Sequence, residues 1–379
     1  MAIINLRSPK YVSYTNASQS SVRFSLKVWT GLESNPPSEF IYVLNKKAIN
    51  IGDKVTIEVS ELIRDYIVTN FNGYSTSPVW VSFLTQALNS TGTVITGGAF
   101  TNLCLDSYSY FEEPSFNIQN KTILFSNRVI YALADNLFRL PIHSYNNPSL
   151  VFFKDGKVID QRSYTRNNSS GGQIYYVSLG GVGNIQTDTY AERVVFDGGT
   201  FENNNCLRAF FDEFEVSAVD KIQIADDYGV YFIDVKTLEE CKYEPKKVTF
   251  INKFGVLQDM YFFKKLVKKM TVKKESYKAN IISNGTYSIS DHVKRDFNVV
   301  GNESISLSSG FLTEDYNEVF KQLMLSEKVW LTNVTEGFEQ VLPINVKTSN
   351  ITYKTSLNDK LVEYTIDFDN SYDTINNIR

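Results

Sequence analysis

Histidine and cysteine are scarce in this chain of 379 residues, which has two of the first and three of the second. His143 and His292 stand outside any His-Glu-x-x-His or comparable frame, so the sequence offers no ligand set for zinc and no histidine-based catalytic motif. We expect both histidines to be structural or exposed. Cys104, Cys206 and Cys241 are odd in number and far apart, so we expect reduced, partly buried thiols rather than a disulfide.

Long apolar runs and an excess of charge are also missing. No apolar segment approaches the ~20 residues that cross a bilayer. The first residues, Met1–Pro9, lack a basic stretch followed by an apolar one, so we expect neither a secretion signal nor a membrane partner. The 38 basic and 42 acidic residues give a net charge of -4. Such a balance provides no overall basic field that would hold nucleic acid.

Aromatic and β-branched residues are what the chain has in quantity, with 26 Phe and 23 Tyr. These residues favour pleated, half-buried surfaces. Apolar residues alternate with polar ones along Val22–Val28, which predicts a strand with one buried face. We predict an all-β fold of tandem β-sandwich or barrel-like domains with a few short helices. The expected domains are an N-terminal β domain (1–113), a middle β domain (114–245) and a C-terminal β-rich domain with one helix (246–379).

Local patterns predict individual elements within these domains. Lys154-Asp155-Gly156 between two apolar runs predicts a tight hairpin, because glycine accepts positive φ freely. Asn252–Gly255 predicts another turn. Ser60 is of the residue type that caps the first turn of a helix, and an apolar stripe follows it.

The stretch from Leu312 to Arg379 predicts one helix followed by a small antiparallel sheet. Thr313 would cap the helix over Asp315–Leu325, and five apolar residues would share its buried face: Tyr316, Val319, Phe320, Leu323 and Met324. Alternating residues predict further strands, one of them at Ile351–Thr355. We expect this stretch to fold as a module of its own.

Other patterns suggest chemistry without supporting it. Gly180–Asn184 lacks the Lys-Ser/Thr and the helix that a phosphate-binding loop needs, so a flexible connection is the better interpretation. Carboxylates occur in pairs at Asp212/Glu213, Asp226/Asp227 and Asp367/Asp369. The last pair lacks the Gly and terminal Glu of a calcium loop. We therefore predict no enzyme activity, no cofactor and no metal.

A cluster of lysines follows Phe262–Phe263 and includes Lys264, Lys265, Lys268 and Lys269. On a helix its apolar residues would form one face and the lysines the other, as in a nucleic-acid or membrane-surface element. The neighbouring β-like runs favour an edge strand protected by lysine instead. The pattern does not decide between helix and strand over Phe262–Met270. We favour an exposed basic face that meets an acidic subunit.

Four aromatic residues complete the set of interface candidates: Trp29, Trp80, Tyr108 and Tyr110. For each of them a core position is the more common alternative.

The amino-acid sequence of two stretches resembles that of virion proteins from tailed phages of Bacteroidota hosts, including crAss-like phages. The first stretch comprises Asn5–Val12, Leu26–Gly31 and Val59–Tyr66. The second comprises Phe250–Val256, Ser309–Asp315, Leu325–Trp330, Tyr353–Thr355 and Leu361–Ile366. Together they cover the first and last thirds of the chain, and no active-site motif is among them.

The resemblance implies a structural subunit of the phage tail, such as a ring, tube, collar or baseplate component. Such a subunit would form a homo-oligomeric ring and contact neighbouring tail or portal-proximal proteins. It would be made in the host cytoplasm and reside in the virion tail, and nucleic acid would meet it only in a tail lumen. The alternative is a receptor- or carbohydrate-binding module of a virion, and a polysaccharide-cleaving enzyme comes third.

Overall fold

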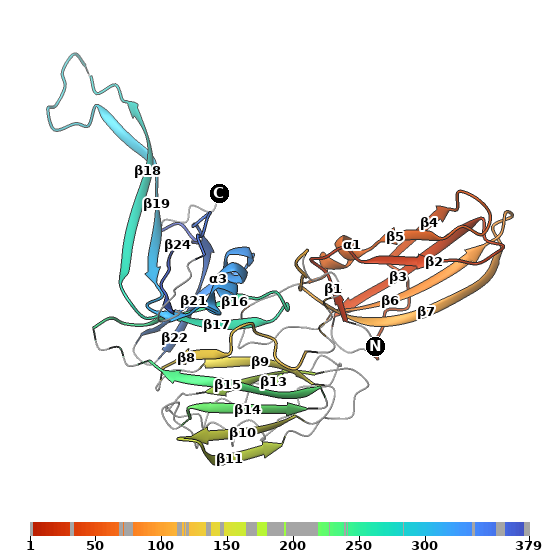
Figure 1. Cartoon of the computed structure of the whole chain (residues 1–379). Coiled ribbons are helices and arrows are strands. Elements are labelled where there is room, and N and C mark those ends of the chain that lie inside the picture. Colours follow the sequence, from red (N-terminus) through yellow and green to blue (C-terminus); the bar gives the residue numbers. More distant parts are fainter. Residues whose placement is uncertain are drawn as a thin grey trace. The chain divides into compact units, whose positions relative to one another are not determined.

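The computed structural model describes residues 3–30, 34–67, 71, 79–111, 116, 118, 121–133, 138–144, 148–163, 173–179, 193–194, 219–226, 228–238, 240, 242–282, 284–335, 338–353 and 361–374 (Figure 1). Over these residues the fold is all-β, with several separate sheets and two helices, which confirms the predicted class. The chain forms two compact units. One comprises Met1–Glu239, Phe250–Asp259 and Glu318–Leu323, and the other comprises Glu240–Thr249, Met260–Asn317 and Met324–Arg379. The predicted three-domain division stays a prediction.

The N-terminal region contains a five-stranded sheet in the order β1-β7-β6-β3-β4. The strands are β1 Ile3–Asn5, β3 Ser21–Thr30, β4 Tyr42–Lys47, β6 Val79–Leu88 and β7 Val94–Leu105. The apolar residues predicted to face inward from β3, including Val22, Phe24 and Leu26, are all buried. The predicted alternation along this strand is confirmed except at Ser25, which is also buried.

A second layer covers this sheet and closes the core. It consists of the strand pair β2 (Tyr11–Tyr14) and β5 (Val55–Glu58), followed by helix α1 (Ser60–Arg64). Val12, Val55, Val59 and Ile63 from this layer pack in one cluster with the inward side chains of the sheet. This two-layered arrangement gives the region its β-sandwich character.

The start of α1 differs from the prediction. Ser60 is the first residue of the helix rather than its cap, and the cap position is held by Val59, which makes no side-chain capping bond. The Glu58 carboxylate accepts hydrogen bonds from the backbone N–H groups of Ser60 (2.8 Å) and Lys10 (3.1 Å) instead. Burial alone would raise the pKa of Glu58, but a hydrogen bond from the Ser60 hydroxyl together with these backbone bonds outweighs it and lowers that pKa.

The middle region holds two further sheets. Five strands have the order β11-β10-β14-β15-β8, namely β8 Val129–Ala132, β10 Ser149–Lys154, β11 Lys157–Ser163, β14 Lys221–Asp226 and β15 Gly229–Thr237. Three have the order β13-β12-β9, namely β9 Phe138–Ser144, β12 Gln173–Leu179 and β13 Arg193–Val194. The predicted hairpin between β10 and β11 is confirmed. Asp155 and Gly156 have φ of 49° and 74°, the positive values that a two-residue turn requires.

The C-terminal region is built around a seven-stranded sheet in the order β17-β16-β21-β22-β24-β19-β18. Its strands are β16 Lys246–Ile251, β17 Leu257–Phe262, β18 Leu266–Lys278, β19 Lys294–Ser308, β21 Val329–Thr335, β22 Phe338–Val346 and β24 Thr365–Asn370. The prediction of a separate module from Leu312 onward is wrong, because β21, β22 and β24 are joined in one sheet to strands from before that point. A short pair, β20 (Leu312–Thr313) and β23 (Leu361–Val362), lies outside this sheet.

Helix α3 (Tyr316–Leu325) is close to its prediction and begins one residue later. Val319, Phe320 and Leu323 are fully buried, which confirms the predicted apolar face. Thr313 lies on β20, where its hydroxyl bonds the Asp315 carboxylate. The strand predicted at Ile351–Thr355 is wrong for residues 351–353, which are irregular, while residues 354 and 355 are outside the described part of the chain.

Candidate interaction surface

Two of the four aromatic interface candidates lie inside the N-terminal sheet. Trp29 on β3 and Trp80 on β6 are directly opposite each other across the two strands. The Trp80 side chain is completely buried and that of Trp29 is 8% exposed. Their burial removes both rings from the surface of the chain. They are core residues, which is the common fate of large aromatic side chains in a sheet.

Tyr108 and Tyr110 follow β7, and their rings are in contact. Their ring centroids are 5.4 Å apart in a T-shaped arrangement. The Arg7 guanidinium lies 5.1 Å above the Tyr108 ring, and the Lys321 Nζ lies 3.5 Å above the Tyr110 ring. Burial raises the pKa of the Tyr108 phenol. These contacts join segments far apart in the sequence, so the two tyrosines also act within the chain.

A buried polar cluster underlies the turn that follows β16. The Asn252 side chain donates to the Leu124 carbonyl (2.7 Å) and to Gln258 Oε1 (3.0 Å). Its Oδ1 accepts from the backbone N–H groups of Phe254 (2.9 Å) and Val256 (3.4 Å). The predicted turn at Asn252–Gly255 is confirmed, and the Asn252 side chain satisfies both ends of its own amide and the Leu124 carbonyl.

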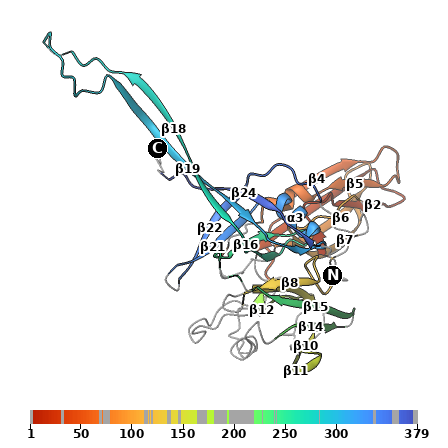
Figure 2. The same cartoon turned by 60° about the vertical axis from the view of Figure 1, so that its left-hand side comes forward.

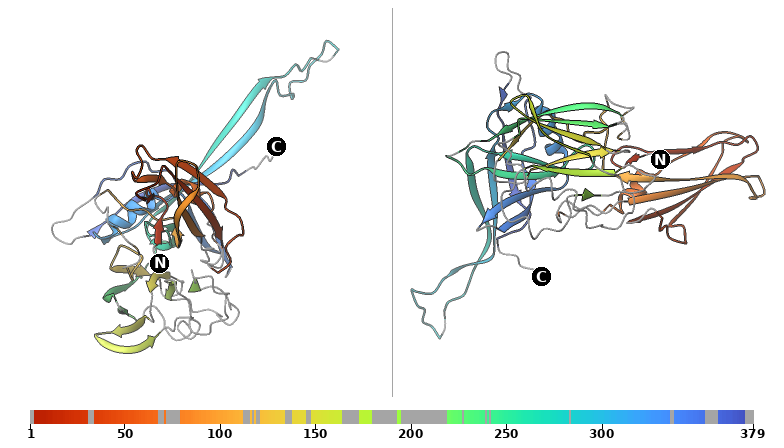
Figure 3. Two further views of the ribbon diagram at one scale, coloured as in Figure 1. Left: turned by 90° about the vertical axis from the view of Figure 1, so that its right-hand side faces the viewer. Right: turned by 90° about the horizontal axis from the view of Figure 1, so that it is seen from below.

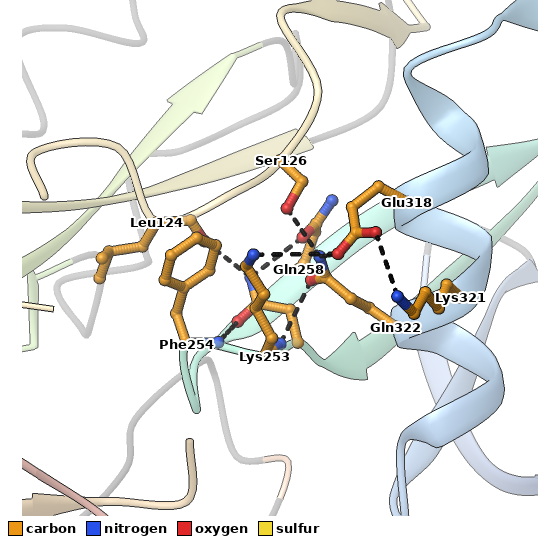
Figure 4. Close-up of polar contacts among 9 residues, drawn as sticks. Leu124, Ser126, Lys253, Phe254, Gln258, Glu318, Lys321 and Gln322 are labelled. Atoms are coloured by element: carbon orange, nitrogen blue, oxygen red, sulfur yellow. Dashed lines mark hydrogen bonds and ion pairs between the residues drawn. The ribbon is translucent and has the colours of Figure 1, made fainter. Parts of the chain in front are cut away.

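Lys253 occupies the centre of this cluster (Figure 4). Its Nζ is 3.9 Å from a Glu318 oxygen and lies between 5.2 and 5.5 Å from the centroids of three rings, those of Tyr110, Phe116 and Phe254. Its backbone N–H donates to Gln322 Oε1 (3.2 Å), and Gln322 Nε2 donates to Ser126 Oγ (2.6 Å). Together these bonds hold the turn against α3. Sequence reasoning missed this cluster because its members lie up to 196 positions apart.

His143 is a structural residue on β9 and not a surface base. Its ring is 1% exposed, and its Nδ1 lies 3.2 Å from the Lys121 carbonyl. Burial lowers the pKa of His143 to about 4, although the Lys121 carbonyl and the Asp226 carboxylate act in the opposite direction. The ring is therefore neutral in the folded protein at pH 7.

This burial predicts a pH dependence of stability. The unfolded chain protonates His143 near its ordinary pKa of about 6.5, whereas the folded chain resists protonation until about pH 4. The contribution of the neutral ring is complete above pH 6.5 and is lost as the pH falls to about 4, a change of about 3 kcal/mol. Urea unfolding of the wild type and of His143→Gln at several pH values between 7.5 and 4 measures it. Equal pH slopes for the two proteins would contradict the assignment.

The remaining chemical candidates have structural partners or are not described. Asp226 accepts from Thr122 Oγ1 (2.7 Å) and from the Tyr228 N–H (2.9 Å), and Asp369 pairs with Lys347 Nζ at 2.9 Å. Within the described residues, no three His, Cys, Asp or Glu side chains are grouped so that they could hold a metal ion. Outside the described residues lie Gly180–Asn184, Asp212, Glu213, Asp227, Cys206 and Cys241.

Cys104 on β7 is buried and free, and burial raises the pKa of its thiol. Neither of the helices in the described part of the chain is both long and apolar enough to span a membrane.

The predicted lysine cluster is the part of the candidate set that reaches the surface. Lys264 is half-buried, and its Nζ lies 2.5 Å from a Glu240 oxygen, which lowers the pKa of that carboxyl. Lys265, Lys268 and Lys269 are exposed. The helical alternative is wrong, because Lys268 and Lys269 lie on strand β18.

Strands β18 and β19 form a long two-stranded ribbon, defined here as Leu266–Ser308 including the connecting residues. Figures 2 and 3 show it extending away from the sheet to which it belongs. Of the residues of β19, only Ser304–Ser308 pair with β24. From Lys294 to Glu303, β19 has β18 as its only described strand partner. The outer part of the ribbon thus stands without a third strand.

A bulge divides the ribbon. The pairing shifts between Lys273 and Glu275, and Asn298 on the opposite strand has a φ of 50°. Such a bulge strengthens the local twist and changes the directions of the side chains beyond it. The Tyr277 and Phe297 rings then meet on one face, with centroids 5.7 Å apart. On the inner part Gly301 leaves room for Met270, since a Cβ there would lie 2.5 Å from the Met270 Cε.

Large apolar side chains are exposed along the whole ribbon. On the strands these are Val267, Met270, Val272, Tyr277, Phe297 and Val299, and in the connection they are Ile282, Tyr287, Ile289 and Val293. Ile289 is 96% exposed. Before the bulge, Val267 and Met270 lie on opposite faces because side chains alternate along a strand. Neither face of the ribbon is therefore a purely polar, solvent-adapted surface.

The ribbon is basic in an acidic chain. Leu266–Ser308 contains seven basic and four acidic residues, a net charge of +3, so the rest of the chain carries -7 of the total of -4. Lys278 and Lys294 lie directly opposite each other next to the connection. Like charges in this position are unfavourable unless something of opposite charge is near. The ribbon thus combines exposed apolar area with a positive field.

No protein-family model matches the chain, and no curated protein matches it. Among solved structures, one titled "Crystal structure of CBD12 from CALX1.2" is similar over 44% of this chain and 72% of its own, with 10% identity and a TM-score of 0.15. A TM-score this low supports no conclusion about fold or function.

Proposed function

We propose that this protein is a non-enzymatic structural subunit that assembles with copies of itself in a bacteriophage tail, as a ring, tube, collar or baseplate component. The proposal of self-assembly rests on one observation, the exposed ribbon β18–β19. The virion part rests on the resemblance of the first and last thirds of the sequence to tail proteins. Neighbouring tail or portal-proximal proteins would be its further partners.

The energetics of the ribbon favour an assembled state. A two-stranded hairpin is at best marginally stable in water, and here ten large apolar side chains on it are exposed. Exposed apolar side chains gathered on one element favour an interaction site there. Covering it in a neighbouring copy would bury apolar surface at about 25 cal/mol per Å². Assembly would therefore stabilise the ribbon and the complex together.

Charge favours contact between different surfaces of two copies. The ribbon carries +3 and the remainder of each chain -7, so the ribbon of one copy is attracted to the body of the next. Two ribbons would repel each other. Contacts between unlike surfaces are heterologous and generate rings when the rotation closes. This is the geometry that a tail ring requires.

Placing a charge on the ribbon tests the proposal. Ile289→Asp is expected to weaken self-association at least tenfold, about 1.4 kcal/mol, because it places a carboxylate in an apolar contact. Sedimentation velocity at several protein concentrations measures the change. The matched control is Ile49→Asp, since Ile49 is an isoleucine of almost the same exposure (94% against 96%) far from the ribbon in sequence. Equal effects of the two variants would count against the ribbon.

A receptor- or carbohydrate-binding module is the second candidate, favoured by one face of the middle sheet. Phe232 on β15 is exposed and borders a hollow of about 540 Å³ that Asp234, Lys221 and Phe153 also line. An exposed ring beside a carboxylate can stack on a sugar and bond its hydroxyls. Trp80, which is buried, has no such role. Glycan binding that disappears in Phe232→Ala would favour this candidate over assembly.

A further inference from the structure

The outer edge of β7 is open and carries no charge. β1 pairs with β7 only at Leu103–Leu105, and no other described strand pairs with the same edge from Val94 to Thr101. All side chains from Val94 to Phe100 are exposed. This segment, Val-Ile-Thr-Gly-Gly-Ala-Phe, contains no charged residue and no proline. An edge of this kind is a ready template for pairing with another strand.

The edge strand at the opposite end of the same sheet is protected. β4 ends this sheet with Lys46 and Lys47. Charges on an edge strand are the common means of preventing strand addition. β7 lacks this protection over most of its 12 residues. The lack of charged residues on β7 is explained if a strand covers this edge in the assembled protein.

β18 supplies a strand of matching length. It is 13 residues long and lies at the end of the seven-stranded sheet, and no described strand pairs with its outer edge. Its lysines, Lys268, Lys269, Lys273 and Lys274, would face their own copies if two β18 strands paired, and like charges there repel. Against β7 they would meet no charge at all. Their aliphatic stems would then cover Val94, Ile95 and Phe100 while the ammonium groups stay in water.

We propose that β18 of one copy adds to the open edge of β7 of a second copy, so that the N-terminal sheet continues into the ribbon of its neighbour. This inference rests on the proposed assembly function and assigns it a contact. Backbone hydrogen bonds would provide the affinity, as in other cases of strand addition. The contact joins two different edges, so each copy keeps one donor and one acceptor, and the chain of contacts forms a ring when the rotation between copies closes.

Cross-linking of mixed variants tests the pairing. Thr96→Cys places a thiol in the middle of the open edge of β7, and Thr271→Cys places one in the middle of β18. Both are made in a Cys206→Ser, Cys241→Ser background, where the buried Cys104 is the only other cysteine. A short bis-maleimide is added to each variant alone and to their mixture. We expect covalent dimers in the mixture and none with either variant alone.

Each other outcome is decisive. Dimers from Thr96→Cys alone would show β7 pairing with itself and overturn the proposal. Absence of dimers in a mixture that still sediments as an oligomer would overturn the contact but leave the assembly function standing. A monomeric mixture would sink both.

A second variant guards against misfolding of the cysteine forms. Thr96→Lys should weaken association at least tenfold, because it gives the β7 edge the charge that it lacks. Thr93→Lys, an exposed position just before β7, should not. Equal association of the two lysine variants would also overturn the contact.

Discussion

Replacement of Trp80 by alanine should lower the free energy of unfolding by about 3–5 kcal/mol. The Trp80 side chain is completely buried at the centre of the N-terminal sheet, opposite Trp29 on β3 and Leu103 on β7, which are also buried. Truncation removes the transfer free energy of an indole and leaves a cavity that the neighbouring strands close only in part. Urea unfolding followed by circular dichroism measures the loss as a lower midpoint at unchanged slope.

Phe111→Ala is the matched control for the Trp80 variant. Phe111 is an aromatic residue that follows Tyr108 and Tyr110 after β7, and its side chain is 99% exposed. The expected change in unfolding free energy is within about 0.5 kcal/mol of zero. Similar losses in the two variants would contradict the placement of Trp80 in the core.

Asn252→Ala should cost about 3 kcal/mol of unfolding free energy. The Asn252 side chain makes four hydrogen bonds, and its loss leaves the Leu124 carbonyl and the Phe254 N–H buried without that partner. Each buried polar group left unsatisfied costs about 1–3 kcal/mol. The cavity of the deleted amide adds to this. Equilibrium unfolding in urea measures the difference from the wild type.

Asn45→Ala is the control for the Asn252 variant. Asn45 on β4 is exposed, and its side chain accepts one hydrogen bond, from Arg23 at 3.2 Å. Water replaces such a bond, so we expect a change near zero. A loss at Asn252 no larger than that at Asn45 would show that the buried cluster does not stabilise the turn.

Elements specified by neighbouring residues could be predicted from the sequence. Asp155–Gly156 encodes its own turn, because the two residues accept the positive φ that a tight hairpin needs. The buried faces of β3 and α3 follow from periods of two and 3.6 residues, and the all-β class follows from the composition.

Features that depend on distant partners could not be predicted. The apolar spacing of Phe262–Met270 is compatible with a helix. The residues from Leu266 onward form a strand because β18 pairs with β19. The residues next to Lys253 in the sequence do not indicate that it is buried, because its partners come from α3 and from the segment around Tyr110. The same reason applies to the candidate interface. Trp29 and Trp80 looked as suitable as any exposed ring until β3 and β6 placed them opposite each other.

The structure moves the candidate interface from aromatic residues to strand edges. Lys268 and Lys269 remain in it, now as part of β18 rather than of a helix. The exposed apolar residues beyond Met270, such as Val272, Phe297 and Ile289, were not singled out by the sequence. Their exposure on both faces of the ribbon is visible only once β19 has its register.

The mass of the purified, intact chain in solution is the most direct test of self-assembly. Native mass spectrometry at micromolar concentration, with sedimentation velocity in parallel, would report it. We expect a discrete species of several copies of the 43.2 kDa chain. A single 43.2 kDa species at every concentration and ionic strength would contradict the account.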